Sequence, residues 1–205
     1  MNRGRFASRL PLAVLGVVVA LTFAGCGSPN HNASAPSTTA ADAGSAAGDV
    51  SSNAAAVSVL LKQGLSQAEA KQLDQAETTF KNVLLLDPNN VYALYNLGVI
   101  EQTRNNAAGA LTYYDKALSA DSTYTPAMYN KAIILEASNL DAALSLYKQI
   151  VAINPSASTA YLRMAFVYAK QGESQKAEEA RAKAIALDAS LAKYPLPAKC
   201  SQPSC

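Results

Sequence analysis

One pattern of small and apolar residues recurs four times along this chain, at spacings of 34, 34 and 33 residues. In each unit a small residue stands at the eighth position, and an alanine follows eleven or twelve residues later. The units are residues 57–90, 91–124, 125–157 and 158–191. The small residues are Gly64, Gly98, Ala132 and Ala165, and the later alanines are Ala76, Ala110, Ala143 and Ala177. A period of this length restricts the chain to an array of similar structural units.

Each unit contains two stretches of about 13 residues with the apolar periodicity of an α-helix. In the second unit, Leu94 and Leu97 mark the first stretch, Leu111 and Tyr114 mark the second, and Asn105 stands between them. The sequence therefore predicts an all-α fold of four helical hairpins. One hairpin cannot bury its own apolar face, so we expect the four to stack. The third unit lacks one residue, which we expect to be missing from the turn between its helices.

The fourth unit departs most from the pattern. Arg181 stands where the other units carry an aromatic residue: Phe80, Tyr114 and Tyr147. Its second stretch is also rich in charged residues, as expected of a terminal repeat with one face in water. Only 190–194 is available for a further helix before Pro195, so we expect at most a turn or two there.

This period, the small residue at position 8 and the aromatic residue at position 24 (position 23 in the shortened third unit, and numbered 24 below) resemble the tetratricopeptide repeat family. The resemblance covers residues 57–191. It implies a right-handed α-solenoid of four hairpins, whose first helices line a concave groove. It also implies a protein or peptide partner and no catalytic activity. Positions 2, 5, 6, 9, 12 and 13 of each first helix point into the groove in that family, and such spacings share one helix face.

Carried onto this chain, the resemblance predicts a polar ladder at position 6 with an apolar row on each side. The predicted groove residues are Lys62, Tyr92, Tyr95, Asn96, Val99, Tyr129, Asn130, Ile133, Arg163 and Phe166. Asparagine can bind both the C=O and the N–H of a peptide, and Lys62 or Arg163 can bind a carboxylate. The alternative is that residues such as Ile133 and Phe166 only pack between neighbouring helices.

Residues 1–25 have the three-part layout of a secretory signal peptide: a basic start, about fifteen mostly apolar residues and a small-residue ending. The apolar run is short for a membrane-spanning helix. The ending Phe23-Ala24-Gly25-Cys26 resembles a bacterial lipoprotein lipobox, although Leu, Val or Ile is usual at the position of Phe23. This resemblance implies lipid attachment at Cys26 and anchoring to the outer face of the cell membrane. The alternative is cleavage after Ala24, which leaves Cys26 as a free thiol.

The segment 26–53 predicts a lipid-anchored flexible linker, because its Ser, Ala, Thr and Asn residues show no apolar periodicity. Its mean span would be about 30 Å. We expect the repeat domain over 54–194 and a C-terminal tail over 195–205. The tail holds Cys200 and Cys205, which can form a disulfide in an oxidising compartment. Free thiols and an intermolecular bridge are the alternatives.

Charge argues against a nucleic-acid partner. The chain carries 17 basic and 15 acidic residues, and three of the basic residues lie in the first ten positions. Without residues 1–25 there are 14 basic and 15 acidic residues, which gives no electrostatic reason to bind nucleic acid. The single histidine, His31, lies in the linker, so we expect no metal site and no cofactor.

Two other functions stay open: a structural subunit of a cell-envelope assembly that uses the convex face or the C-terminal end, and an enzyme with a site near Glu101 and Glu136.

Overall fold

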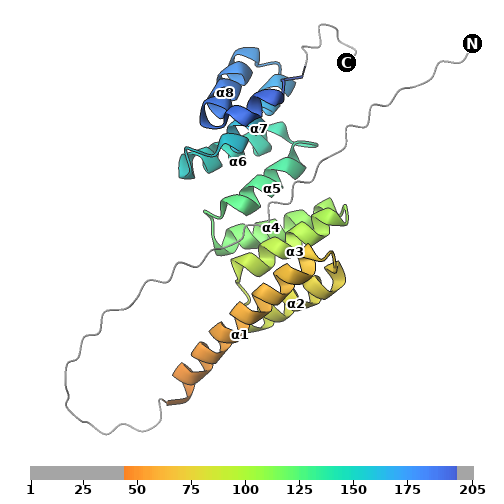
Figure 1. Cartoon of the computed structure of the whole chain (residues 1–205), viewed down its shortest axis with the longest axis vertical. Coiled ribbons are helices and arrows are strands. Elements are labelled where there is room, and N and C mark those ends of the chain that lie inside the picture. The colour runs from red at the N-terminus through yellow and green to blue at the C-terminus, as the bar shows by residue number, and fades with distance from the viewer. Residues whose placement is uncertain (1–43, 198–205) are drawn as a thin grey trace, which may run out of the picture. The chain divides into compact units, whose positions relative to one another are not determined.

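The computed structural model describes residues 44–197, with side-chain surroundings from residue 53 onward. This part of the chain contains eight α-helices, one short 3₁₀ helix and no strand (Figure 1). The helices are α1 (Gly44–Glu69), α2 (Leu73–Leu86), α3 (Val91–Thr103), α4 (Ala107–Ala120), α5 (Thr125–Leu135), α6 (Leu140–Ile153), α7 (Ser158–Lys170), α8 (Ser174–Leu187) and η1 (Ala189–Lys193). The all-α prediction is confirmed. The chain divides into two compact units after Val50, and the repeats belong to the second, residues 51–205.

Several predictions lie outside the described residues. These are the signal peptide, most of the linker, the lipid-attachment residue Cys26 and the pair Cys200 and Cys205. Within residues 44–197, no helix is both long enough and apolar enough to cross a membrane.

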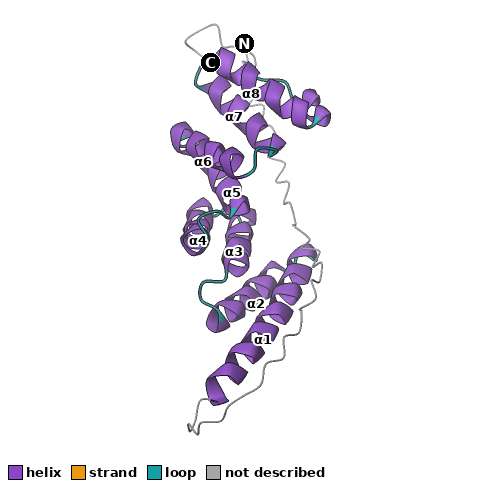
Figure 2. Ribbon diagram, turned by 90° about the vertical axis from the view of Figure 1, so that its left-hand side faces the viewer, coloured by secondary structure: helices purple, strands orange, loops and turns teal. Residues whose placement is uncertain are grey.

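Successive helices pair into four hairpins, one for each predicted repeat (Figure 2). In three of the hairpins, a residue with left-handed backbone geometry follows the first helix. These residues are Lys71 (φ 61°), Asn105 (φ 61°) and Gly172 (φ 80°). A residue with left-handed backbone geometry at this position ends a helix and redirects the chain. The turns within the first, second and fourth hairpins therefore share the same backbone geometry.

Two boundaries differ from the sequence prediction. Helix α1 begins at Gly44, so the last ten residues of the predicted linker 26–53 are helical. In the third repeat, α5 has 11 residues where α3 has 13. The missing residue therefore shortens the end of the first helix, and the turn 136–139 is not shorter than the others. The turn has no left-handed residue, and it reaches α6 by a different backbone path.

The core of each of the first three hairpins contains a fully buried aromatic ring of the second helix. Phe80, Tyr114 and Tyr147 are each 0% exposed. A Cβ atom on Gly64 would lie 2.7 Å from Cε1 of Phe80, and one on Gly98 would lie 2.5 Å from Cε1 of Tyr114. In the first two repeats, glycine therefore lets the ring lie directly against the backbone of the first helix.

Neighbouring hairpins are joined by apolar residues at positions 3 and 10 of the first helices α3, α5 and α7, and also at position 7 of α3 and α7, whereas position 7 of α5 is Lys131. At the junction of α2 and α3, one buried cluster contains Ala76, Phe80, Val83, Ala93, Leu97 and Ile100. In α1, which has no preceding repeat, the corresponding residues are Val59, Gln63 and Ser66, and all three are exposed. Two of the three are polar, so this end of the array is adapted to water and not to a further hairpin.

The other end of the array is covered by η1 and the residues that follow it. Leu191 of η1 is buried against Leu162 of α7 and Ala184 of α8. Arg181 donates hydrogen bonds to the backbone oxygens of Tyr194 (3.2 Å) and Ala192 (3.0 Å). Helix α8 packs against η1 and not against a further hairpin. At the position where the other repeats carry an aromatic residue, Arg181 therefore binds backbone carbonyl groups at the end of η1.

We expect Leu191→Ala to lower the free energy of unfolding of the last repeat by about 2–3 kcal/mol, because it removes the buried side chain that holds η1 in place. Hydrogen exchange of the α8 amides would measure this local loss, with the exposed Lys193→Ala as the control. Unchanged exchange in α8 would show that η1 does not stabilise the end of the array.

Candidate binding face

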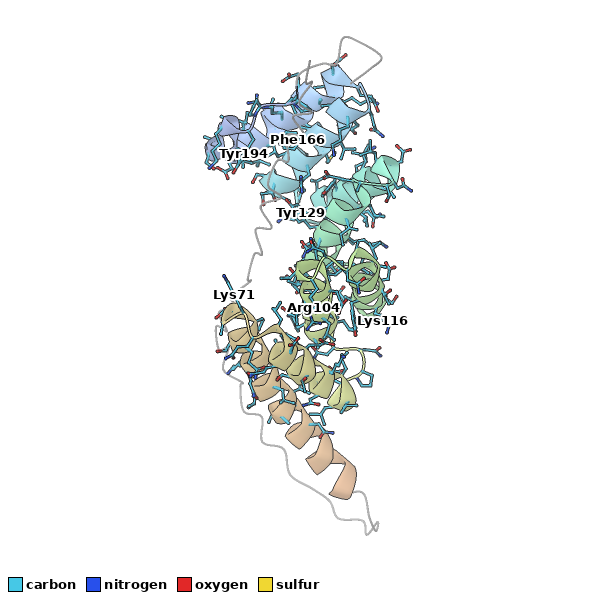
Figure 3. All side chains as sticks on the ribbon, turned by 90° about the vertical axis from the view of Figure 1, so that its right-hand side faces the viewer. Lys71, Arg104, Lys116, Tyr129, Phe166 and Tyr194 are labelled. Carbon is cyan, nitrogen blue, oxygen red and sulfur yellow. The ribbon has the colours of Figure 1, made fainter. Side chains whose placement is uncertain are left out.

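All ten predicted groove residues lie on the first helices α1, α3, α5 and α7; we call the surface that they form the first-helix face. Lys62 and Tyr92 are exposed, and Tyr92 is 42% exposed. Seven more are half-buried: Asn96, Val99, Tyr129, Asn130, Ile133, Arg163 and Phe166. Figure 3 shows Tyr129 and Phe166 on α5 and α7, and Lys116 on the second helix α4. The face thus presents partly accessible side chains in every repeat.

Tyr95 differs from the prediction, because it is a core residue. It is 9% exposed and belongs to the buried cluster around Leu94, Ala110 and Tyr114. Its ring lies 6.0 Å from that of Tyr114 and 5.5 Å from that of Tyr124. The ring is therefore used for packing between the second and third repeats and is not available for contact with a partner.

Asn130 also has a structural task. Its Nδ2 lies 3.2 Å from the hydroxyl oxygen of Tyr95 and 3.3 Å from that of Tyr114. The Tyr114 hydroxyl donates its only hydrogen to Oε1 of Gln102, at 2.7 Å, so Asn130 must be the donor to Tyr114. Burial raises the pKa of Tyr114, which keeps this hydroxyl protonated. Asn130 therefore joins the second and third repeats through its amide nitrogen, and only its Oδ1 can accept from a partner.

Asn96 is less constrained. Its Nδ2 donates one hydrogen bond to the backbone oxygen of Tyr92, at 2.7 Å. Its second N–H and its Oδ1 make no hydrogen bond to the other described residues. Asn96 can therefore bind both groups of a peptide unit, as the sequence predicts, whereas Asn130 offers an acceptor alone.

The third and fourth repeats meet at a charged cluster on this face. The Glu136 carboxylate accepts a hydrogen bond from the Tyr147 hydroxyl at 2.8 Å. The same carboxylate lies 3.6 Å from Nε of Arg163 and 3.4 Å from Nζ of Lys170. The Glu136 side chain is only 9% exposed, so the two cations hold a nearly buried carboxylate. Burial, and Glu136 next to it, raise the pKa of Tyr147, which keeps its hydroxyl a donor.

Gln102, Glu136 and Lys170 were not among the predicted groove residues, although the sequence contains a signal for Gln102 and Glu136. Position 12 of the first helix accepts a hydrogen bond wherever position 24 is a tyrosine. The pairs are Gln102 with Tyr114 and Glu136 with Tyr147. Where position 24 lacks a hydroxyl, position 12 is alanine: Ala68 with Phe80 and Ala169 with Arg181. The two positions therefore vary together within this one chain, as hydrogen-bonding partners do.

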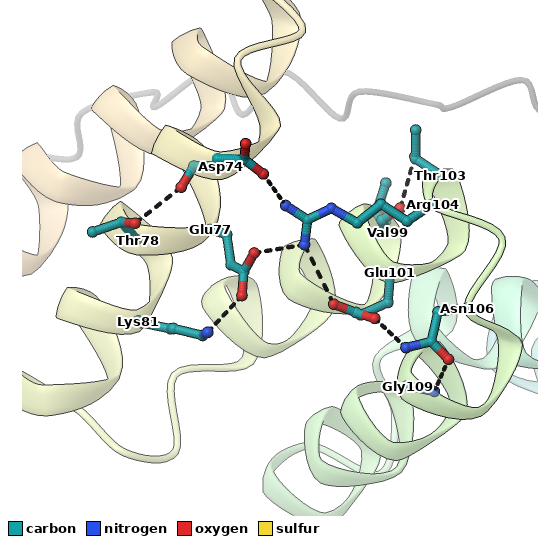
Figure 4. Close-up of polar contacts among 10 residues, drawn as sticks. All are labelled: Asp74, Glu77, Thr78, Lys81, Val99, Glu101, Thr103, Arg104, Asn106 and Gly109. Carbon is teal, nitrogen blue, oxygen red and sulfur yellow. Dashed lines mark hydrogen bonds and ion pairs between the residues drawn. The ribbon is translucent and has the colours of Figure 1, made fainter.

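A second charged network joins the first two repeats near the turn that follows α3 (Figure 4). Arg104 forms ion pairs with Asp74 and with Glu77 of α2, the latter at 2.5 Å, and lies 3.6 Å from Glu101. Hydrogen bonds from Lys81 and Arg104 lower the pKa of Glu77. Glu101 and Glu136, proposed above as a possible catalytic pair, thus belong to separate networks, and each is paired with its own cations.

Other kinds of site receive little support from residues 44–197. No group of His, Cys, Asp or Glu in this part of the chain could hold a metal ion. An open cavity near α1 and α2 is lined by Gln67, Asp74, Gln75, Thr78 and Thr79, none of which belongs to the first-helix face as predicted.

Two sequence profiles described as tetratricopeptide repeat match residues 61–125 and 135–193, which together make up more than half of the chain. The chain belongs to the tetratricopeptide repeat family. Arrays of this kind are generally non-catalytic and present extended surfaces for protein interaction. No curated protein matches the chain.

Solved structures agree on the fold. A crystal structure of MamA is 24% identical and covers 67% of this chain and 81% of its own, with a TM-score of 0.60. A tetratricopeptide repeat protein from Parabacteroides merdae is 22% identical. The match covers 65% of this chain and 54% of that protein, with a TM-score of 0.59. YrrB, described as a TPR protein with an unusual peptide-binding site, is 24% identical. The match covers 68% of this chain and 74% of YrrB, with a TM-score of 0.57.

Proposed function

We propose that this protein is an extracytoplasmic scaffold, anchored by lipid at Cys26, that holds a peptide or a segment of a partner protein along its first-helix face. Membership of the repeat family supports protein interaction in general. The peptide-binding site named for YrrB, which shares the fold, is consistent with the same use here. The signal-like residues 1–25 and the lipobox-like ending support the export and the anchor.

One observation carries the proposal: the first-helix face combines accessible apolar surface with polar atoms that have no internal partner. Val99, Ile133 and Phe166 are half-buried at position 9 of successive repeats. Next to this row, Oδ1 of Asn96 and Oδ1 of Asn130 make no hydrogen bond within residues 53–197. A bound segment can bury its side chains on the apolar row and pair its backbone with these atoms.

Both ends of the array favour this face over the alternative of a structural subunit that stacks through its ends. At the N-terminal end, Ser66 stands where Ile100, Ile134 and Val167 help to join one hairpin to the next, and Ser66 is exposed. At the C-terminal end, η1 covers Leu162 and Ala184. An array whose ends are covered or polar has its main exposed binding surface along its length.

We expect a photo-crosslinking residue, p-benzoylphenylalanine, to capture a partner in intact cells when it replaces Tyr92 or Val99 on α3. The same residue at Thr112 or Lys116, exposed on the second helix α4, is the matched control and should capture little. Bands that appear only from Thr112 and Lys116 would reject the first-helix face and favour the structural-subunit alternative. These positions are preferable to Asn130, because its replacement would also break the contacts with Tyr95 and Tyr114.

We also expect Cys26→Ser to abolish lipid attachment and to move the protein from the membrane fraction to the soluble extracytoplasmic fraction. The thioether that carries the lipid cannot form on serine, and loss of the acyl chains removes most of the membrane affinity. Mass spectrometry of the N-terminal peptide provides the direct measurement. A wild-type protein that begins at Cys26 without diacylglycerol would contradict the anchor and leave the repeat domain unaffected.

A further inference from the structure

The buried core of the array is interrupted between the second and third hairpins. One buried cluster joins the first two hairpins and takes three residues from α2 and three from α3. Another runs without a break through α5, α6, α7 and α8. The cluster around Tyr114 contains only one buried residue of the third repeat, Ala127. The N-terminal half (α1–α4) and the C-terminal half (α5–α8) are therefore each held by a shared core, and little core connects them.

A charged residue lies where these two halves meet. We call the contact of α5 with α3 and α4 the middle joint. Position 7 is Leu97 (1% exposed) in α3 and Met164 (8% exposed) in α7, but it is Lys131 in α5. The Lys131 side chain is 26% exposed, and its Nζ lies 2.5 Å from Oδ1 of Asp115 on α4, which is 56% exposed. An ion pair in contact with water stabilises much less than a buried leucine or methionine side chain.

The turns of the second and third hairpins are not linked at the middle joint either. At the first junction, Arg104 in the turn of the second hairpin forms an ion pair with Asp74 in the first turn of α2. At the last junction, Nε2 of Gln171 donates to Oδ1 of Asp141 in the first turn of α6, at 2.7 Å. Helix α4 has an alanine at that position, and the polar side chains of turn 136–139 bind within the third and fourth repeats.

The remaining contacts of the middle joint can change at low cost. Ile134 at position 10 is half-buried, whereas Ile100 and Val167 at the same position are buried. The hydrogen bonds from Asn130 to two tyrosine hydroxyls measure 3.2 and 3.3 Å, at the long end of the normal range. Water can replace polar contacts near the surface, so a small rotation here costs less than one that opens a buried core.

We propose that the middle joint is a hinge, about which the N-terminal half and the C-terminal half turn as two packed bodies, because Lys131 replaces an apolar contact there. Packed bodies joined by few contacts are the usual arrangement for hinge motion. The first-helix face crosses this hinge, with Tyr92 and Asn96 on one half and Arg163 and Phe166 on the other. Rotation therefore changes the distance between the two parts of the face, and with it the length of a segment that can contact both.

The test measures distances between two nitroxide labels in the full chain, purified in detergent. The labels are attached to p-acetylphenylalanine, which leaves the native cysteines unchanged. One pair crosses the hinge, Ala108 with Ala152. The matched pairs within each half are Gln75 with Ser119 and Ser138 with Ala186, and all six positions are exposed. Each pair spans roughly the length of a second helix, about 20 Å.

We expect the distance distribution across the hinge to be about twofold wider than those within the halves, because local rigidity follows buried apolar contact. Lys131→Met introduces the residue type of Met164 and should narrow the distribution across the hinge toward the other two. Lys116→Met, exposed on α4, is the control and should leave all three unchanged. Circular dichroism checks that the variants are folded.

Three equally narrow distributions in the wild type would overturn the hinge, whatever the variants do. A distribution across the hinge that stays wide in folded Lys131→Met would overturn the role assigned to Lys131. Neither result depends on a partner, so the proposed function would stand in both cases.

Discussion

Tyr114→Ala is expected to lower the free energy of unfolding by about 3–5 kcal/mol, the largest effect that we predict for a single residue. The ring is 0% exposed and lies at the centre of the second hairpin. Its removal leaves a cavity against Gly98 and also breaks the hydrogen bonds with Gln102 and Asn130. Urea unfolding followed by circular dichroism would measure the loss.

Tyr114→Phe separates the hydroxyl from the ring. It should cost about 1 kcal/mol, because Oε1 of Gln102 loses its donor while the packing is kept. Adding Gln102→Ala reproduces the pair Ala68 and Phe80 of the first repeat. The double variant should therefore lose less than the sum of the two single variants. Strict additivity would show that positions 12 and 24 are not coupled.

Gly98→Val is expected to cost about 2–3 kcal/mol, because its side chain would overlap the fully buried ring of Tyr114, which must shift to make room. Even a single Cβ at this position would lie 2.5 Å from Cε1 of Tyr114. The branched side chain of valine adds two methyl groups to that overlap. Thermal or urea unfolding of the full chain would measure the change.

Gly98→Ala is the matched comparison and should stay within about 1 kcal/mol of the wild type. Its close contact opposes the gain in helix propensity, which is itself about 1 kcal/mol. Alanine already occupies this position in the third and fourth repeats, as Ala132 and Ala165. If valine and alanine proved equally stable, the close approach of ring and backbone would not limit residue size here.

The repeat pattern predicted the hairpins because each depends on residues close together in the sequence. Gly98 and Tyr114 are 16 positions apart in one hairpin, and Gly64 and Phe80 repeat the same small-and-large pair in the first hairpin. The ends of the second helices were equally readable, since Asp87, Asp121, Asn154 and Asp188 follow them directly. The third turn could not be predicted as well, because a deletion of one residue can shorten either the turn or the end of the helix before it.

The predicted groove residues lie on the first helices, as expected, but two of them make contacts within the array. Tyr95 and Asn130 hold the position and residue type of groove contacts, yet they bind each other between repeats. Whether such a side chain faces a partner or a neighbouring hairpin depends on how the two hairpins are placed against each other. That placement results from packing along the whole junction, which a single-repeat pattern does not contain.

By itself, the sequence determined the four hairpins, their boundaries to within a few residues except at the start of α1, and the helices that form the candidate face, because periodicity and residue size act locally. Only the tertiary structure decided which of those side chains are already occupied. In the folded protein, Arg163 pairs with Glu136, which is 27 positions away in the sequence, and Arg181 binds the backbone at the C-terminal end of the array. Ion pairs and hydrogen bonds of this kind depend on distances between separate hairpins, and those distances are fixed only when the hairpins stack.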